Sequence, residues 1–122
     1  MSSRIEQATG KRVFKIVSAE AWRSAVADGT YRGSGDDRRD GYIHLSAAPQ
    51  VAATYQKYFE NQRDLLLVAF EAAALGPQLK WEVSRGGEHF PHYYGVLQTA
   101  MACFEAPISA GLPGLQALLE DQ

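Results

Sequence analysis

The stretch Leu65-Leu66-Leu67-Val68-Ala69-Phe70 decides the fold, because six apolar residues follow one another without a polar break. A strand with one face in solvent would carry a polar residue at every second position. A short apolar run bounded by the polar turn 61–64 is typical of a central strand that is covered on both faces. We therefore predict that residues 65–70 form the middle of a sheet.

Further strands and helices are predicted on either side of this run. Alternating patterns with β-branched and aromatic residues predict strands at 13–17, 42–46, 78–84 and 98–105. A capping serine, a first-turn proline and helical leucine spacing predict helices at 19–27, 49–59 and 112–119. Two long Gly-containing segments, 31–41 and 85–95, are predicted to be loops. This order predicts a single α+β domain with one mixed, mostly antiparallel sheet flanked by short helices.

The bulk composition is that of one ordinary globular domain. The chain has 122 residues, of which 46% are hydrophobic and 21% charged, enough to bury a core without a metal or a disulfide. The polar residues 1–11 are predicted to form a loose tail, and 12–122 the domain. A formal net charge of −2 argues against binding to duplex nucleic acid, which usually requires a basic excess.

The sequence carries no pattern of a secreted or membrane protein. No stretch approaches the roughly 20 apolar residues that cross a bilayer, and residues 1–11 contain no signal-peptide core. The single cysteine, Cys103, rules out an intramolecular disulfide. Its apolar neighbours in 100–104 predict a small buried residue. We therefore expect a cytoplasmic protein without a membrane partner.

Alternation also places polar side chains where an ordinary core would not have them. Lys15 lies between two valines on one face of the first strand, and burying an unpaired ion costs several kcal/mol. His44 and Ser46 share a face of the second strand, and Glu82 projects from the polar face of the strand 78–84. If these strands are neighbours, the residues form one cleft. The long loops add Arg32, Arg38, Arg39, Arg85, His89 and His92.

Two simple site chemistries are weaker explanations of this set. His89 and His92 lie three residues apart, but zinc needs three or four ligands, so that His44 and Glu82 would have to complete the site. We expect no metal. Ser46 and His44 could touch as nucleophile and base, but no Gly-X-Ser-X-Gly elbow is present, and no third group orients the base.

A glycosyl-transfer site fits the same residues better. Cleavage at an anomeric carbon creates positive charge that a carboxylate stabilises, and Glu82 can supply it. The phosphates of a nucleotide need arginine or backbone N–H donors, which Arg32, Arg85 and the turn at 86–87 can supply. Tyr94 can stack on a base or a nicotinamide ring. The pattern predicts a pocket for a small anionic, nucleotide-like ligand.

Five motifs occur in order between residue 12 and about residue 108. They are Phe14-Lys15-Ile16-Val17, Tyr31-Arg32-Gly33-Ser34, Asp40-Gly41-Tyr42-Ile43-His44-Leu45-Ser46, Trp81-Glu82-x-Ser84-Arg85-Gly86-Gly87 and Phe90-Pro91-His92-x-Tyr94-Gly95. Together they resemble the bacterial domain-of-unknown-function 952 family (DUF952). The resemblance implies an ADP-ribosyltransferase-like fold, in which a split, mostly antiparallel sheet binds NAD in a central cleft.

The resemblance also implies roles for individual residues. It implies NAD as the substrate, Glu82 as the catalytic glutamate, and His44 with Ser46 as the second catalytic motif. The resemblance adds Lys15 as a ligand contact. The other predicted ligand contacts come from the long loops and are Arg32, Arg85, His92 and Tyr94. A lysine in the first motif departs from the His or Arg that transferases place there. The expectation is therefore an enzyme of ADP-ribosyl transfer or NAD hydrolysis, with a non-catalytic ligand-binding module as the alternative.

Overall fold

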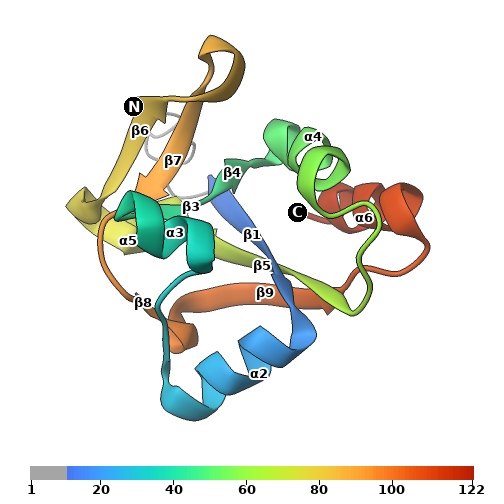
Figure 1. Ribbon diagram of the computed structural model, residues 1–122, viewed down its shortest axis with the longest axis horizontal. Coiled ribbons are helices and arrows are strands. Elements are labelled where there is room, and N and C mark those ends of the chain that lie inside the picture. The colour runs from blue at the N-terminus through green and yellow to red at the C-terminus, as the bar shows by residue number, and fades with distance from the viewer. Residues whose placement is uncertain (1–10) are drawn as a thin grey trace, which may run out of the picture.

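The apolar run 65–70 forms the body of β5 (Leu65–Glu71), as predicted. β5 is an inner strand of a four-stranded sheet in the order β4-β1-β5-β9, and residues 67–70 have no exposed surface. Figure 1 shows β5 running between β1 and β9. The computed structural model describes residues 11–122, so the predicted tail, apart from Lys11, lies outside the described residues.

The described chain forms one α+β domain with five helices and three antiparallel sheets. The helices are α2 (Ala19–Asp28), α3 (Gly35–Asp40), α4 (Ala48–Tyr58), α5 (Ala72–Leu75) and α6 (Gly111–Glu120). The large sheet contains β1 (Arg12–Ser18), β4 (Ser46–Ala47), β5 and β9 (Ala102–Pro107). The small sheets pair β2 (Thr30–Tyr31) with β8 (Leu97–Gln98), and β3 (Ile43–His44) with β7 (His89–Tyr93) and β6 (Leu79–Val83). The prediction of one mixed sheet was wrong.

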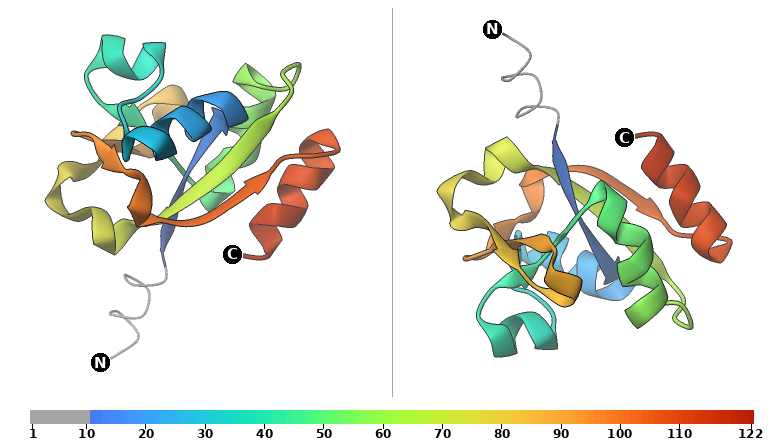
Figure 2. Two further views of the ribbon diagram at one scale, coloured as in Figure 1. Left: turned by 90° about the horizontal axis from the view of Figure 1, so that it is seen from below. Right: turned by 90° about the horizontal axis from the view of Figure 1, so that it is seen from above.

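Each face of the large sheet is covered by its own apolar core. On one face Val68 packs in a cluster with Trp22 of α2. On the other face Leu67 packs with Val51 of α4 and Leu115 of α6. Figure 2 shows α2 on one side of the sheet and α4 with α6 on the other. No helix within residues 11–122 is both long enough and apolar enough to cross a membrane.

The predicted strand 42–46 is divided between two sheets. Ile43 and His44 pair with β7, whereas Ser46 pairs with Phe14 of β1. Leu45, between them, is buried in the core. Because this segment leaves β1 after two paired residues, the remainder of that edge of β1 is not covered by a strand in the described chain.

The segment 31–41 contains a helix where a loop was predicted. α3 begins with a capping box: Ser34 Oγ accepts from the Asp37 N–H at 3.3 Å, and Asp37 Oδ2 accepts from the Ser34 N–H at 2.9 Å. Gly41 ends the helix with φ 85°, a conformation that favours glycine. The Ser-x-x-Asp capping pattern is present in the sequence, but the density of Gly and Asp residues around it favoured the prediction of a loop.

The segment 85–95 contains β7, which was also predicted to be a loop. β6 and β7 form a hairpin in which Trp81 faces Pro91. Pro91 and the neighbouring glycines argued against a strand. The hairpin turn needs its glycines, because Gly86 and Gly87 have φ values of 64° and 78°.

One further helix is confirmed and one strand needs correction. The helix 19–27 is present, with Ser18 Oγ accepting from the Ala21 N–H at 3.0 Å, and Trp22 and Ala25 are its buried residues. The strand 98–105 begins later, as β9, and Cys103 is exposed rather than buried. β9 is the outer strand of its sheet, so alternate side chains face solvent.

Gly114 of α6 gives a test of how closely this helix packs. An added methyl group at Gly114 would overlap the carbonyl oxygen of Ser109. We expect Gly114→Ala to cost about 1–3 kcal/mol of unfolding free energy, since overpacking forces the backbone to shift. Gly35→Ala in α3 is the matched control, because nothing lies near the added group. Urea denaturation measures both variants, and equal midpoints would contradict this packing.

Candidate functional site

A pocket of about 580 Å³ lies beside the uncovered edge of β1. Its walls come from β1, α3, α4 and the β3-β7-β6 sheet. Phe14, Ile16 and Val51 supply apolar surface, whereas Lys15 and His44 supply polar surface. The volume is in the range that small-molecule ligands occupy in proteins.

Asp37 is the most deeply buried carboxylate of this pocket, with 1% of its side chain exposed. Its Oδ1 accepts hydrogen bonds from Lys15 Nζ at 3.3 Å, from His44 Nδ1 at 2.7 Å and from the His44 N–H at 3.1 Å. Its Oδ2 lies 3.0 Å from Lys15 Nζ and also accepts from the Ser34 N–H. Asp37 therefore joins β1, α3 and β3.

Lys15, which is largely but not fully buried, has its negative partner within the protein. Its Nζ binds Asp37 and donates to the carbonyl oxygen of His44 at 2.9 Å. Burial lowers the pKa of Lys15, although the charge of Asp37 opposes that effect. Burial alone would raise the pKa of Asp37, but hydrogen bonds from His44 and the charge of Lys15 hold it well below its usual range. Both observations describe a closely paired, mostly desolvated ion pair.

His44 does not pair with Ser46. Its Nδ1 faces Asp37 at 2.7 Å, and its Nε2 lies 3.1 Å from Asp40 Oδ2. The hydroxyl of Ser46 lies 3.3 Å from Thr54 Oγ1. Both ring nitrogens of His44 therefore face carboxylates, and His44 and Ser46 do not form the nucleophile–base pair considered above.

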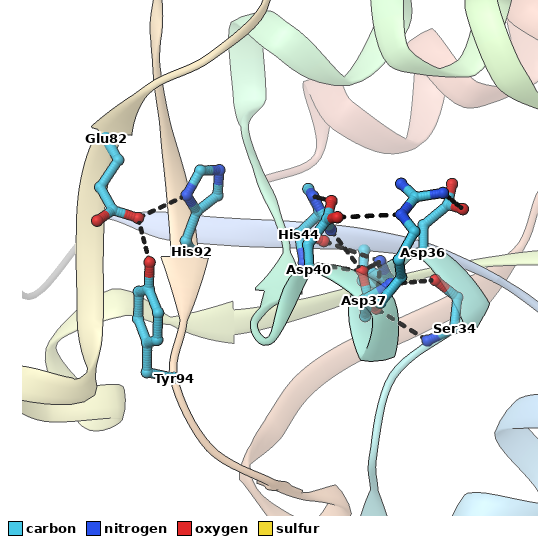
Figure 3. A network of polar contacts seen from close by, with 10 residues as sticks. Ser34, Asp36, Asp37, Asp40, His44, Glu82, His92 and Tyr94 are labelled. Atoms are coloured by element: carbon cyan, nitrogen blue, oxygen red, sulfur yellow. Dashed lines mark hydrogen bonds and ion pairs between the residues drawn. The ribbon is translucent and has the colours of Figure 1, made fainter.

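A second carboxylate–histidine pair lies on the β6-β7 hairpin. Glu82 Oε1 accepts from His92 Nδ1 at 2.7 Å and from the Tyr94 hydroxyl at 2.8 Å. These two hydrogen bonds, that from His92 first, lower the pKa of Glu82, and the bond to Glu82 raises the pKa of Tyr94. Figure 3 shows the three side chains together, beside the network around Asp37. Glu82 is thus an ionised carboxylate with 39% of its side chain exposed.

His92 connects this pair to the pocket. Its ring lines the pocket, is 3% exposed, and stacks on Tyr42 with the ring centroids 4.1 Å apart. Its Nε2 is buried and has no hydrogen-bond partner among residues 11–122. A buried polar atom without a partner costs about 1–3 kcal/mol, so the interactions within the described chain do not account for it.

The structure brings most of the predicted site residues into one region. In the β3-β7-β6 sheet, His92 of β7 lies opposite His44 of β3 and opposite Lys80 of β6. Because Glu82 is two residues from Lys80, its side chain is on the same face of this sheet as His92 and His44. The predicted residues that line the pocket are Lys15, His44, Ser46 and His92. Glu82 and Tyr94 adjoin it through His92.

The two predicted arginines, Arg32 and Arg85, differ in what the structure describes of them. Arg32 is exposed and outside the pocket lining. Arg85 begins the hairpin turn (Arg85–Gly87), next to Ser84, which does line the pocket. The side chain of Arg85 lies outside the described atoms. Within the described residues, the guanidinium of Arg32 therefore does not belong to the pocket.

The structure adds residues to the site that the sequence analysis did not include. Asp37 and Asp40 were placed in a loop, and Tyr42 was given no role. The two-histidine metal site is wrong, because His89 and His92 are three residues apart in a strand and project from opposite faces of β7. Within the described chain, no three His, Cys, Asp or Glu side chains are arranged to hold a metal ion.

Acid should weaken the contribution of Asp37 to stability. Because its pKa is lower in the folded state than the usual value of about 3.9, this contribution is complete above about pH 4 and is lost as the pH falls towards the folded-state pKa. Asp37→Asn removes this titration and leaves Lys15 without its counter-charge. We expect a loss of about 3 kcal/mol or more at pH 7, and a smaller further loss than wild type between pH 5 and pH 3.

Urea denaturation at pH 7, 5 and 3 measures both effects. Asp36→Asn is the matched control, because the same change falls on a carboxylate that is 69% exposed. It should change stability by less than about 1 kcal/mol. If Asp37→Asn were as sensitive to acid as wild type, Asp37 would not be the source of the pH dependence.

Comparison with known proteins places this geometry in a family. The family model described as protein of unknown function (DUF952) matches residues 16–103. The crystal structure of protein CC0527 from Caulobacter crescentus is 42% identical to the chain, with a TM-score of 0.85 over 89% of this chain and 98% of that one. The solution NMR structure of CC0527, also 42% identical, has a TM-score of 0.79 over 91% and 98%. No protein with a curated description matches the chain.

Proposed function

We propose that this chain, which belongs to the family described as protein of unknown function (DUF952), binds a nucleotide-like ligand in the pocket and acts on the glycosidic bond of NAD. The reaction is transfer of ADP-ribose to an acceptor or to water. The observation that carries this proposal is Glu82, whose carboxylate is held by His92 and Tyr94 and remains 39% exposed.

The state of Glu82 suits this chemistry. Breaking the bond between the ribose and the nicotinamide nitrogen develops positive charge on the sugar, which a carboxylate stabilises. The charge is absent from the ground-state ribose, so the interaction is stronger in the transition state and accelerates the reaction. The lowered pKa of Glu82, caused first by the hydrogen bond from His92, keeps its carboxylate ionised at neutral pH.

The pocket beside Glu82 supports a ligand that carries a charged ring. Three aspartates, Asp36, Asp37 and Asp40, line it with only two Lys or Arg side chains, Lys15 and Arg39. Each of these cations already pairs with an aspartate. A positively charged nicotinamide ring fits this excess of carboxylates over free cations better than a negatively charged phosphate does. The phosphates of NAD then belong near the turn that Arg85 begins, next to the lining residue Ser84, and this turn supplies donors that the sequence analysis assigned to the phosphates.

A binding module without turnover is the second candidate. The observation that favours it is the Lys15–Asp37–His44 network, in which each polar group already has a partner within the protein. Such a network stabilises the fold and does not by itself supply a catalytic group. In that case the pocket recognises the ligand, and Glu82 contributes only to affinity.

Glu82→Gln separates these two functions. Glutamine keeps the shape and the capacity to accept from His92 and Tyr94 but removes the charge. An enzyme should then lose turnover by about 10²-fold or more, by analogy with the loss of one electrostatic stabiliser, with little change in affinity. Calorimetric titration with NAD and ADP-ribose, beside an assay of nicotinamide release, measures both quantities.

Glu60→Gln is the control, since it makes the same change on an exposed residue outside the pocket. It should alter neither binding nor turnover. If the Glu82→Gln variant released nicotinamide as fast as wild type, the proposed role of the Glu82 charge in catalysis would be wrong. A wild-type protein that binds NAD or ADP-ribose but releases no nicotinamide would leave the binding module as the function, and one that does neither would exclude both.

A further inference from the structure

His92 is the one buried histidine of the pocket, and its surroundings fix its ring on several sides. Tyr42 stacks on it at 4.1 Å with an interplanar angle of 25°, and the ring of His44 meets it edge-on at 5.5 Å. Glu82 holds Nδ1 at 2.7 Å. The ring therefore has little freedom to turn in search of another partner.

The partner at Nδ1 determines the state of Nε2. An ionised carboxylate can only accept a hydrogen bond, so Nδ1 carries the proton that binds Glu82. In the neutral imidazole, Nε2 then carries a lone pair and acts as an acceptor. Figure 3 shows the second ring nitrogen of His92 directed away from Glu82. Nε2 is thus a buried acceptor without a donor in the described chain.

Three polar side chains of the site are already committed to other acceptors. Lys15 Nζ donates to Asp37 and to the carbonyl oxygen of His44. The Tyr94 hydroxyl donates to Glu82. The nitrogens of His44 face Asp37 and Asp40. These three donors are therefore not available to Nε2, and the open space beside the ring is the pocket that His92 lines. Because Nε2 is itself buried, a ligand donor reaches it by displacing a neighbouring side chain of the pocket wall.

We infer that His92 is a ligand-binding residue whose Nε2 accepts a hydrogen bond from a hydroxyl or carboxamide N–H of the ligand. Glu82 acts here as the positioning residue that fixes the tautomer. The inference rests on the proposed function in that it concerns the same pocket and ligand, but it requires binding and not turnover.

The acceptor character of Nε2 defines the chemical class that the pocket selects. A sugar hydroxyl or a primary amide presents a donor, whereas a carboxylate presents only lone pairs and a negative charge. A site that hydrogen-bonds a particular group rejects an analogue that lacks it, because its own polar atom is left unpaired. Nicotinamide and nicotinic acid, which share one ring and differ in this group, form the matched pair of probes.

His92→Asn tests the role of Nε2 separately from that of Nδ1. The side-chain amide of asparagine can occupy the place of the Nδ1–H and donate to Glu82, but nothing replaces Nε2. We expect the affinity for ADP-ribose and for nicotinamide to fall by about tenfold. His89→Asn is the matched control on the opposite, exposed side of β7, and it should leave both affinities unchanged. Calorimetric titration provides the measurement.

Nitrogen NMR of the histidine side chains provides a second readout on the wild-type protein, which is needed if His92→Asn fails to fold. The expected spectrum shows His92 with a protonated Nδ1 and an unprotonated Nε2. The Nε2 resonance should move when ADP-ribose or nicotinamide is added, and should not move with nicotinic acid. A proton on Nε2 in the free protein would overturn the inference, as would an Nε2 resonance that responds to neither donor-bearing probe.

The outcomes for the two proposals are distinguishable. If no nicotinamide is released from NAD but Nε2 responds to ADP-ribose or nicotinamide, the catalytic proposal fails and the role of His92 stands. If Glu82→Gln abolishes turnover while His92→Asn binds ADP-ribose as tightly as wild type, the role of His92 fails and the catalytic proposal stands.

Discussion

The largely buried ion pair between Lys15 and Asp37 is the constraint on which the arrangement of the site depends. Lys15 comes from the large sheet and Asp37 from α3, and the pair lies in a setting where only 1% of the Asp37 side chain is exposed. An unpaired charge at this depth would cost several kcal/mol. The fold therefore has to bring α3 against β1, and the same carboxylate then holds the backbone and ring of His44 in β3.

Two carboxylate–histidine pairs lie next to each other in this site. They differ in the exposure of the carboxylate and in whether both ring nitrogens have a partner. In the pair of Asp37 and His44 the acid is buried and both ring nitrogens face carboxylates, so neither ring nitrogen is left for a ligand. In the pair of Glu82 and His92 the acid is 39% exposed and one ring nitrogen has no partner within residues 11–122. The first pair stabilises the fold, and the second is the pair to which we assign the proposed ligand.

The pocket itself follows from a short interruption in strand pairing. Because β4 covers β1 only at Val13 and Phe14, the rest of that edge faces α3, α4 and the β3-β7-β6 sheet, and the space between them is the pocket. Apolar residues of β1 and α4 line one part of it, and the polar residues of α3, β3 and β7 line the other. A ligand with an apolar ring and a donor-bearing group matches both surfaces, which is why we favour a nucleotide-like ligand over a simple anion.

The amino-acid sequence alone determined the elements whose local pattern agrees with their environment. Periodicity and capping predict the apolar run of β5 and the two helices α2 and α4. Periodicity also predicts the polar strand faces that carry His44, Ser46 and Glu82. α3 and β7 were not predicted, because Gly, Asp and Pro dominate their local signals while distant contacts stabilise them: Asp37 through Lys15, and β7 through its pairing on both edges. Likewise, alternation showed that Lys15 needed a negative partner, but only the tertiary structure identified Asp37 as that partner and left Nε2 of His92 without one. The physical reason is that a local pattern specifies which way a side chain points, whereas the identity of its partner depends on chain segments that lie far apart in the sequence.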